Sequence, residues 1–309
     1  MAEKKHKTMI GGQAVIEGVM MKGPRSTAMA VRKTDGEISL ETWENKDLGD
    51  RSPFFRIPLI RGVVNFVQML RFGYQCLMKS AEIAGIEEEP SNLEQKVEKA
   101  FGEKTLKALM SLSSLIGIVL AIVLFVVIPS VFISKTDVFL HYGAYKTLAE
   151  GLLKIGIFLL YLFLISKISD IGRVFEYHGA EHKTISCYEN GKELTVENAR
   201  GCTRFHPRCG TSFILIVFIV SILVFSFVTW SSLAVRILLK LLLLPFVVGV
   251  SYEIIKFAGR HDNSLMRFLL APGLWLQRMT TREPDDSQLE VAIQSLEAVL
   301  TGNPEDDGW

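Results

Sequence analysis

The feature that most constrains the fold of this chain is a pair of long segments without a charged residue. They run from Ala108 to Ser134 and from Cys209 to Val235, and each holds 27 residues. About 20 predominantly apolar residues are enough for a helix to cross a bilayer. The sequence therefore predicts two transmembrane helices, which places the chain in a membrane rather than among two-domain soluble proteins.

Two further segments, 148–168 and 237–257, are apolar with a few charges toward their ends. Long basic side chains at helix ends can extend to the lipid headgroups, so these charges are compatible with two more spans. We therefore expect a mainly α, polytopic membrane protein with four transmembrane helices. The charged residues in these two segments are Glu150, Lys154, Lys167, Lys240, Glu253 and Lys256.

The distribution of basic residues predicts the orientation in the membrane. The polar loop 167–210 holds seven Lys or Arg residues, whereas the other two connections hold only Lys135, Lys146 and Arg236. Positive residues favour the cytoplasmic side. We expect a multi-pass protein of the cell membrane with both termini in the cytoplasm. On this topology the cysteines face a reducing compartment and should be free thiols; they are Cys76, Cys187, Cys202 and Cys209.

Four consecutive regions follow from these patterns. We expect a cytoplasmic N-terminal β region (1–56), interfacial and amphipathic helices (57–107), a membrane domain with the polar loop (108–257), and an interfacial segment with an acidic tail (258–309). In the first region, two strand-like runs flank Asp35-Gly36, a tight-turn signal. The glycine-rich stretch 11–25 predicts turns in a small sheet, or a close approach of the backbone to another group.

Helical patterns account for the rest of the second and fourth regions. Segments 57–84 and 265–279 are apolar with interspersed basic residues. Only nine residues separate Arg61 from Arg71, too few to span, so we expect interfacial helices. Between them, 91–107 predicts a charged amphipathic helix that begins with a capping box. The acidic tail carries apolar residues at helical spacing and should fold back on the protein or remain free; these residues are Leu289, Ala292, Leu296 and Val299.

The polar loop carries the residues that point to chemistry. His178 and His182 are four residues apart, so on a helix they share one face and can bind one metal ion. The order His-x-x-Glu-His is that of the inverted zinc-peptidase motif, and it predicts Glu181 as a catalytic base. Gly179 weakens this helix, and a hydrogen-bonded polar cluster without metal is the plain alternative.

A second half-site lies downstream in the same loop. His206 and Cys209 are three residues apart around a proline, and Cys202 adds a thiol nearby. With the two helical histidines, His206 and Cys209 would complete a tetrahedral zinc site. Four protein ligands would make a closed, structural site, whereas three would leave one position open for water. Glu253 is a further possible ligand, although an ion pair with a nearby basic residue explains it as well.

Cys209 also permits a use without metal. It begins an apolar helix, and the helix dipole together with Arg204 and Arg208 would lower the thiol pKa or attract an anionic lipid. The expected partners are the lipid bilayer, anionic lipid near Arg204 and Arg208, and proteins at the cytoplasmic face, but not nucleic acid.

Several segments together resemble the YqhQ-type bacterial membrane proteins, a family of unknown function that is often labelled a predicted metal-dependent enzyme. The resemblance covers most of the chain and implies a multi-span protein of the cytoplasmic membrane. It places His178, Glu181, His182, His206 and Cys209 within the family's motifs, whereas Cys202 lies outside them. The segments are GGQAVIEGVMMKGP (11–24), YHGAEHKTISCYENG (177–191), HPRCGTSF (206–213) and APGLWLQRMTTREPDD (271–286).

These observations favour a metal-dependent, hydrolase-like membrane enzyme with zinc at the cytoplasmic interface. The metal ligands would come from His178, His182, His206 and Cys209, and Glu181 would be the general base. The alternative is a non-enzymatic scaffold, biogenesis factor or lipid-binding protein with a structural His/Cys cluster. A transporter is less favoured, because four spans carry few charges and show no repeated halves.

Overall fold

A computed structural model describes residues 7–45, 52–85, 115–228, 232–261, 263–303 and 306–308. The chain forms two compact units. Unit 1 comprises Met1–Gly85, Leu162–Val217 and Pro245–Trp309, and unit 2 comprises Ile86–Tyr161 and Phe218–Leu244. Each unit is assembled from segments far apart in the sequence. The predicted regions 1–56, 57–107, 108–257 and 258–309 divide the chain along its length instead, and they remain a prediction.

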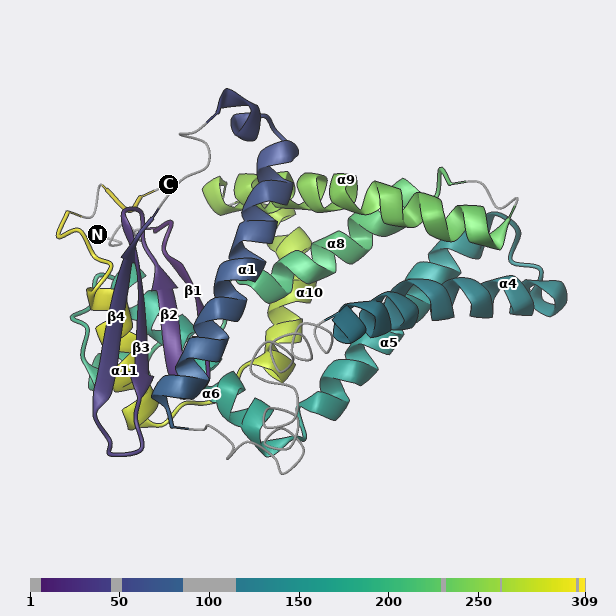
Figure 1. Cartoon of the computed structure of the whole chain (residues 1–309). Helices are drawn as coiled ribbons and strands as arrows, with labels where there is room; N and C mark the ends of the chain where they lie inside the picture. The colour runs from purple at the N-terminus through teal and green to yellow at the C-terminus, as the bar shows by residue number, and fades with distance from the viewer. Residues whose placement is uncertain are drawn as a thin grey trace, which may run out of the picture. The chain divides into compact units, whose positions relative to one another are not determined.

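Unit 1 contains a four-stranded antiparallel sheet with the strand order β1-β2-β3-β4 (Figure 1). This confirms the small N-terminal β region. Asp35-Gly36 lies in the turn between the last two strands, where Gly36 has a φ of +88°, which glycine adopts at little steric cost. The strands are β1 (Gly11–Val15), β2 (Gly18–Lys22), β3 (Ser26–Arg32) and β4 (Ile38–Glu44).

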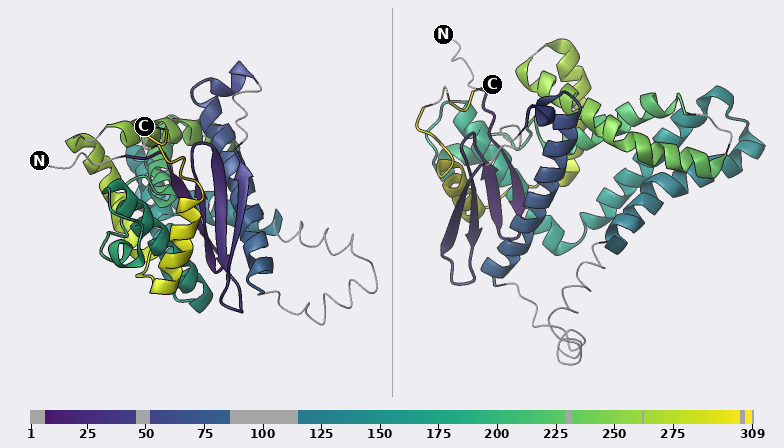
Figure 2. Two further views of the ribbon diagram at one scale, coloured as in Figure 1. Left: turned by 90° about the vertical axis from the view of Figure 1, so that its left-hand side faces the viewer. Right: turned by 45° about the horizontal axis from the view of Figure 1, so that its top comes forward.

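Both faces of the sheet are covered, because alternate residues of each strand point to opposite sides. Helix α1 (Ile60–Ile83) packs on one face, against Met20 and Met29. Helices α6 (Ser169–Glu189) and α11 (Asp286–Glu297) pack on the other face, against Val19 and Ala28. Figure 2 (left) shows these helices on opposite sides of the strands. The central strands are therefore apolar on both faces.

The acidic tail folds back on the protein. Its four apolar residues at helical spacing lie on α11, or just after it, and are buried against the sheet and α6. The helix begins with a capping box in which Asp285 and Gln288 each bond the other's backbone N–H. The sequence predicted that the tail either folds back on the protein or remains free, and the structure shows that it folds back.

The predicted helix 57–84 is present as α1, and the short 3₁₀ helix η2 (Pro53–Arg56) precedes it. Helix α1 buries Gly62 against Tyr252 of α9 (Leu233–Arg260), and Gly73 against Gln13 of the sheet. Its interfacial position remains a prediction, as does that of 265–279, which lies within α10 (Ser264–Thr280). The predicted helix 91–107 lies outside the described residues.

Three helices in the described part of the chain are long and apolar enough to cross a membrane. They are Leu115–Leu140, Lys146–Ile165 and Leu233–Ala258. The first includes the π-helical turn η3 (Val123–Val127) and α4 (Ile128–Leu140). The second is α5, which follows the short 3₁₀ helix η4 (Gly143–Tyr145), and the third belongs to α9. These helices indicate association with a membrane.

One of the four predicted spans, that from Cys209 to Val235, is not confirmed. The charge-free run from Cys209 to Val235 contains the apolar helix α8 (Gly210–Phe225), which has 16 residues. A helix of that length extends about 24 Å, which is short of the hydrocarbon thickness of about 30 Å. The chain turns after Phe225, and α9 has already begun at Leu233. The charge-free run therefore extends beyond the end of α8 and includes the first residues of α9, so its length overestimates the length of a helix.

Candidate metal centre

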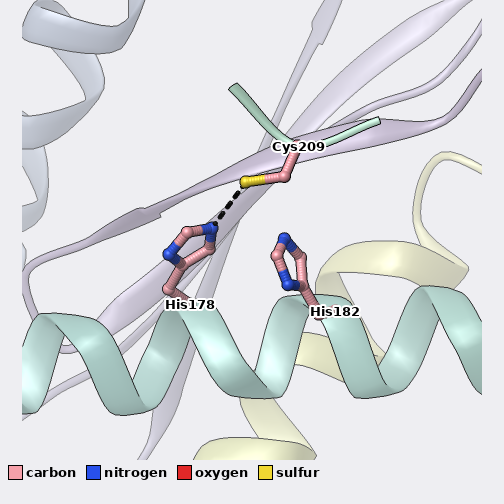
Figure 3. Close-up of side chains that lie close together, drawn as sticks. All are labelled: His178, His182 and Cys209. Carbon is pink, nitrogen blue, oxygen red and sulfur yellow. Dashed lines mark hydrogen bonds between the residues drawn. The ribbon is translucent and has the colours of Figure 1, made fainter. Parts of the chain in front are cut away.

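Helix α6 carries the two histidines that the sequence singled out. His178 and His182 are one turn apart on the same face, and their ring centroids are 4.4 Å apart. Figure 3 shows both side chains pointing from this helix toward Cys209. The middle of α6 is buried, with residues 179–187 all shielded from solvent. The helix therefore buries the imidazole of His182, whereas His178 is partly exposed.

Gly179 has a packing role that outweighs its low helix propensity. A Cβ at this position would lie 2.0 Å from the carbonyl oxygen of Arg282, in the segment that follows α10. The N–H of Arg282 also donates to the carbonyl of Phe175 on α6, at 2.8 Å. Only a glycine lets this backbone approach so closely. Gly179 lowers the intrinsic stability of the helix, but it also allows the segment after α10 to pack against α6 beside the site.

Each site histidine is oriented by a backbone carbonyl from outside α6. Nδ1 of His178 lies 2.8 Å from the carbonyl oxygen of Thr280, and Nδ1 of His182 lies 2.6 Å from that of Arg204. Because a carbonyl can only accept, Nδ1 is the protonated nitrogen of the neutral ring, and Nε2 keeps its lone pair. Nε2 of His182 is buried and has no hydrogen-bond partner among the residues that the structure describes. Histidines that bind metal ions usually donate the N–H of their other ring nitrogen in this way, which fixes the orientation of the ring.

Cys209 completes the group from the residue before α8. Its Sγ lies 3.2 Å from Nε2 of His178, the contact drawn in Figure 3. One ligand atom from each of His178, His182 and Cys209 lies within 4.8 Å of the others. Burial opposes charge on both groups, but the charge and hydrogen bond of Cys209 raise the pKa of His178 to about 9. His178 and His182 in turn hold the pKa of Cys209 well below its usual value.

Glu181 is buried beside this group, with 4% of its surface exposed. Burial raises its pKa, and the charges of His182 and His178 act in the opposite direction. The N–H of Gly12 donates to its carboxyl group, and Oε2 has no partner among the described residues. A Cβ on Gly12 would lie 3.1 Å from the carboxyl carbon. The glycine-rich stretch therefore forms strands, and it also allows β1 to approach Glu181 closely.

His206 lies beside the group but not within it. Its ring centroid is 5.6 Å from that of His182, and its Nε2 is 3.6 Å from Oε2 of Glu189 and 3.2 Å from Nη2 of Arg208. Burial opposes ionisation of Glu189, but His206 and Arg208 outweigh it and lower the pKa of this carboxyl to about 2. The imidazole of His206 is thus directed at a carboxylate.

Four further residues of the sequence analysis lie outside the group. Cys202 donates from its thiol to the carbonyl of Asn198 at 3.3 Å. Glu253 forms an ion pair with Arg61 of α1, with Nε and Oε1 2.7 Å apart. Arg208 is paired with Glu189, and Arg204 is paired with Glu283 at 2.9 Å. The four cysteines are free in the structure.

Sequence reasoning missed the residues that hold this site in place. The buried side chain of Gln277 accepts from the backbone N–H of His206 at 2.8 Å and donates to its carbonyl oxygen at 2.7 Å. Thr280, on the same helix, supplies the carbonyl that orients His178. Both residues lie in the 271–286 segment that carried the family resemblance. That segment was the one signal that could have found them.

The donor set suits a soft or borderline metal ion. Two imidazole nitrogens and one thiolate are ligands that zinc prefers, at about 2.0–2.3 Å, so that ligand atoms lie roughly 3.3–3.8 Å apart. The separation of up to 4.8 Å among the three atoms requires only small side-chain rotations. Three protein ligands would leave one position open, whereas His206 could close the site only by leaving Glu189.

Comparison with known proteins agrees with the family resemblance. The chain matches the model of a protein family of unknown function (DUF1385) over residues 57–302. It is 35% identical over 302 residues to the uncharacterised protein YqhQ of Bacillus subtilis (strain 168), covering 96% of this chain and 94% of that protein. No solved structure gives a significant match. With this extent of agreement, the chain belongs to the DUF1385 family, the YqhQ-type proteins of unknown function.

Proposed function

We propose that this protein is a zinc-dependent hydrolase of the cell membrane, with its site on the cytoplasmic side. The observation that carries the proposal is the arrangement of His178, His182 and Cys209. Nδ1 of both imidazoles is locked by a backbone carbonyl. Nε2 of His182 has no partner among the described residues, and Nε2 of His178 contacts the thiol of Cys209, whose pKa is lowered. Such an arrangement is what a three-ligand zinc site requires.

The residues take distinct roles in this proposal. His178, His182 and Cys209 would hold the ion, which would supply Lewis acidity and lower the pKa of a water molecule toward neutral pH. Glu181 accepts the proton of the attacking water, because it is a buried carboxyl group with an unpartnered oxygen beside the ligands. The same carboxyl group would then pass this proton to the leaving group.

A membrane-embedded or lipid-linked substrate fits the surroundings of the site. Cys209 directly precedes the apolar helix α8, and unit 1 also contains the end of the span Leu233–Ala258. A polar bond at the end of an apolar chain could therefore reach the site from the bilayer. This part of the proposal includes the predicted orientation, with both termini in the cytoplasm.

Metal content tests the proposal first. We expect about one zinc per chain in protein purified without chelators, measured by inductively coupled plasma mass spectrometry, and its loss in the His178→Ala/His182→Ala variant. The matched control is His141→Ala/His261→Ala, which removes two exposed histidines and should keep the zinc. A folded wild-type protein without metal would overturn the mechanism.

Two single variants then separate catalysis from structure. Glu181→Gln should retain the zinc but lose at least about a hundredfold of any hydrolysis found with fluorogenic ester, amide and phosphodiester substrates. His206→Ala should leave zinc affinity unchanged if the site has three ligands. A loss of tenfold or more in His206→Ala would instead indicate a closed site, and hence the structural role of a scaffold or biogenesis factor.

A further inference from the structure

Unit 2 contains a second buried polar cluster, which is independent of the proposed zinc site. Its members come from the three helices that are long enough to cross a membrane. Charged side chains are costly within a bilayer, and those that persist there usually serve a function. All five side chains are at least nine-tenths buried; they are Ser130, Glu150, Lys154, Arg236 and Lys240.

One half of the cluster is held by bonds among its own members. Oε1 of Glu150 forms an ion pair with Lys240 and accepts from the hydroxyl of Ser130 at 2.6 Å. Nη2 of Arg236 donates to the backbone carbonyl of Ser130 at 2.7 Å. These bonds join α4, α5 and α9. The arrangement is built to place Glu150 at a defined position between the helices.

The other half lacks partners among the described residues. Oε2 of Glu150 is buried without a hydrogen bond. Lys154 is only 7% exposed, and no described residue accepts a hydrogen bond from its ammonium group. Its Nζ lies over the ring of Phe225, 5.3 Å from the centroid. An aromatic face attracts a cation but gives it no hydrogen-bond acceptor.

The two unpartnered groups are complementary and lie close together. Lys154 follows Glu150 by four residues on α5, so the two side chains share one face, one turn apart. The ammonium group can only donate, and the carboxylate oxygen can only accept. A ligand that satisfies both must carry an anionic oxygen next to an O–H or N–H donor. A chloride ion lacks the donor, and so does the choline headgroup.

Depth in the membrane favours a lipid as the source of this ligand. Glu150 and Lys154 are the fifth and ninth residues of α5, so they lie about 6 Å and 12 Å along the helix from its first residue. A headgroup drawn between helix ends can reach this depth, as in the basic pockets that bind phospholipid headgroups. We propose that unit 2 binds a phosphate group with an adjacent donor between Glu150 and Lys154, supplied by phosphatidylethanolamine or phosphatidylglycerol.

Native mass spectrometry of the full chain in detergent tests this site. Phosphatidylethanolamine and phosphatidylglycerol should bind at least about tenfold more tightly than phosphatidylcholine, which has the phosphate but no donor. Lys154→Met should weaken the binding of both lipids at least about tenfold, because it removes the contact to their phosphate, whereas Lys167→Met, the same change at an exposed lysine, should leave their binding unchanged. Lys154→Arg keeps the charge and the donors and should retain the preference within about threefold.

Two further arms keep the test decisive. Inorganic phosphate is added as a competitor: displacement that depends on Lys154 would support the site and identify free phosphate as the source. If Lys154→Met does not fold, as judged by size-exclusion chromatography, Lys154→Gln replaces it. Equal binding of the three lipids by the wild type, with no effect of phosphate, would overturn the proposal.

Discussion

The two units each bury a polar cluster, but they satisfy it in different ways. In unit 1, Nδ1 of His178 and Nδ1 of His182 bond the backbone carbonyls of Thr280 and Arg204. Nε2 of His178 contacts Cys209, and Nε2 of His182 has no partner among the described residues. In unit 2, Glu150 bonds side chains, the ammonium of Lys240 and the hydroxyl of Ser130. The first cluster is thus oriented by main chain, and the second by an ion pair.

This difference has consequences for how each cluster responds to change. Backbone carbonyls cannot be removed by substitution, so the unit 1 site is sensitive to whatever moves the main chain. A buried ion pair is sensitive to the loss of one partner, because the other is left as an uncompensated charge. The comparison predicts that packing variants act on the first cluster and charge variants on the second.

The largest effect is expected from breaking the ion pair of unit 2. Lys240→Met leaves Glu150 charged among apolar helices and should lower the free energy of unfolding by about 4 kcal/mol. Lys240→Met/Glu150→Gln should recover at least half of that loss, because the uncompensated charge is gone. Thermal unfolding in detergent measures both variants. An additive double variant would show that the two side chains do not act as a pair.

The next effect comes from the main chain of unit 1. Gly179→Ala places a Cβ against the carbonyl oxygen of Arg282 and should destabilise the protein by about 3 kcal/mol, with a parallel loss of zinc. Gly201→Ala is the matched control, since its Cβ would meet nothing nearer than 3.6 Å. Unfolding temperature and zinc content are measured together. A stable Gly179→Ala protein with full zinc would contradict the packing described for α6.

The third prediction concerns the zinc affinity of the protein and tests Cys209 as a ligand. Cys209→Ser replaces a thiolate with a poor zinc ligand and should weaken zinc binding by about a hundredfold, measured by competition with a chromophoric chelator. Cys202→Ser should have no effect, because that thiol bonds the carbonyl of Asn198. Equal losses in the two variants would place Cys202 in the site and remove the case for an open coordination position.

The smallest effect is expected at Glu253. This carboxylate is partly exposed and pairs with Arg61, so Glu253→Gln should cost about 1 kcal/mol or less. Zinc content should be unchanged, and Arg61→Met should produce the same modest drop in unfolding temperature, because both variants break one pair. Zinc loss in Glu253→Gln alone would make Glu253 a ligand after all.

Local patterns predicted much of the fold. Strand alternation around Asp35-Gly36 gave the hairpin of β3 and β4, and apolar spacing gave α11, because both depend on neighbours within a few residues. The long segments without charged residues predicted where apolar helices lie, but they did not predict the residues at which those helices begin and end. The run from Cys209 to Val235 was interpreted as one span, although it holds a short helix, a turn and the start of α9.

The candidate site shows the same division. The spacing of His178 and His182 predicted that they share a helix face, and both proved to lie on α6. Glu181 was assigned from the same motif, and its burial beside the ligands is compatible with that assignment. His206 was grouped with the ligands by proximity in sequence, but its ring is directed at Glu189. The local sequence does not distinguish an imidazole that belongs to a metal-binding group from one that pairs with a carboxylate.

By itself, the sequence determined the membrane class of the protein, its small sheet, its tail helix and the candidate ligands on α6. Only the tertiary structure decided which backbone carbonyls orient those ligands, and why Gly12 and Gly179 are glycines. It also decided that Oε2 of Glu150 lacks a hydrogen-bond partner among the described residues, as does the buried ammonium group of Lys154. The reason is physical: helix and strand patterns arise from contacts between near neighbours, whereas burial and hydrogen bonding of polar groups depend on segments that fold together from 20 or more residues apart.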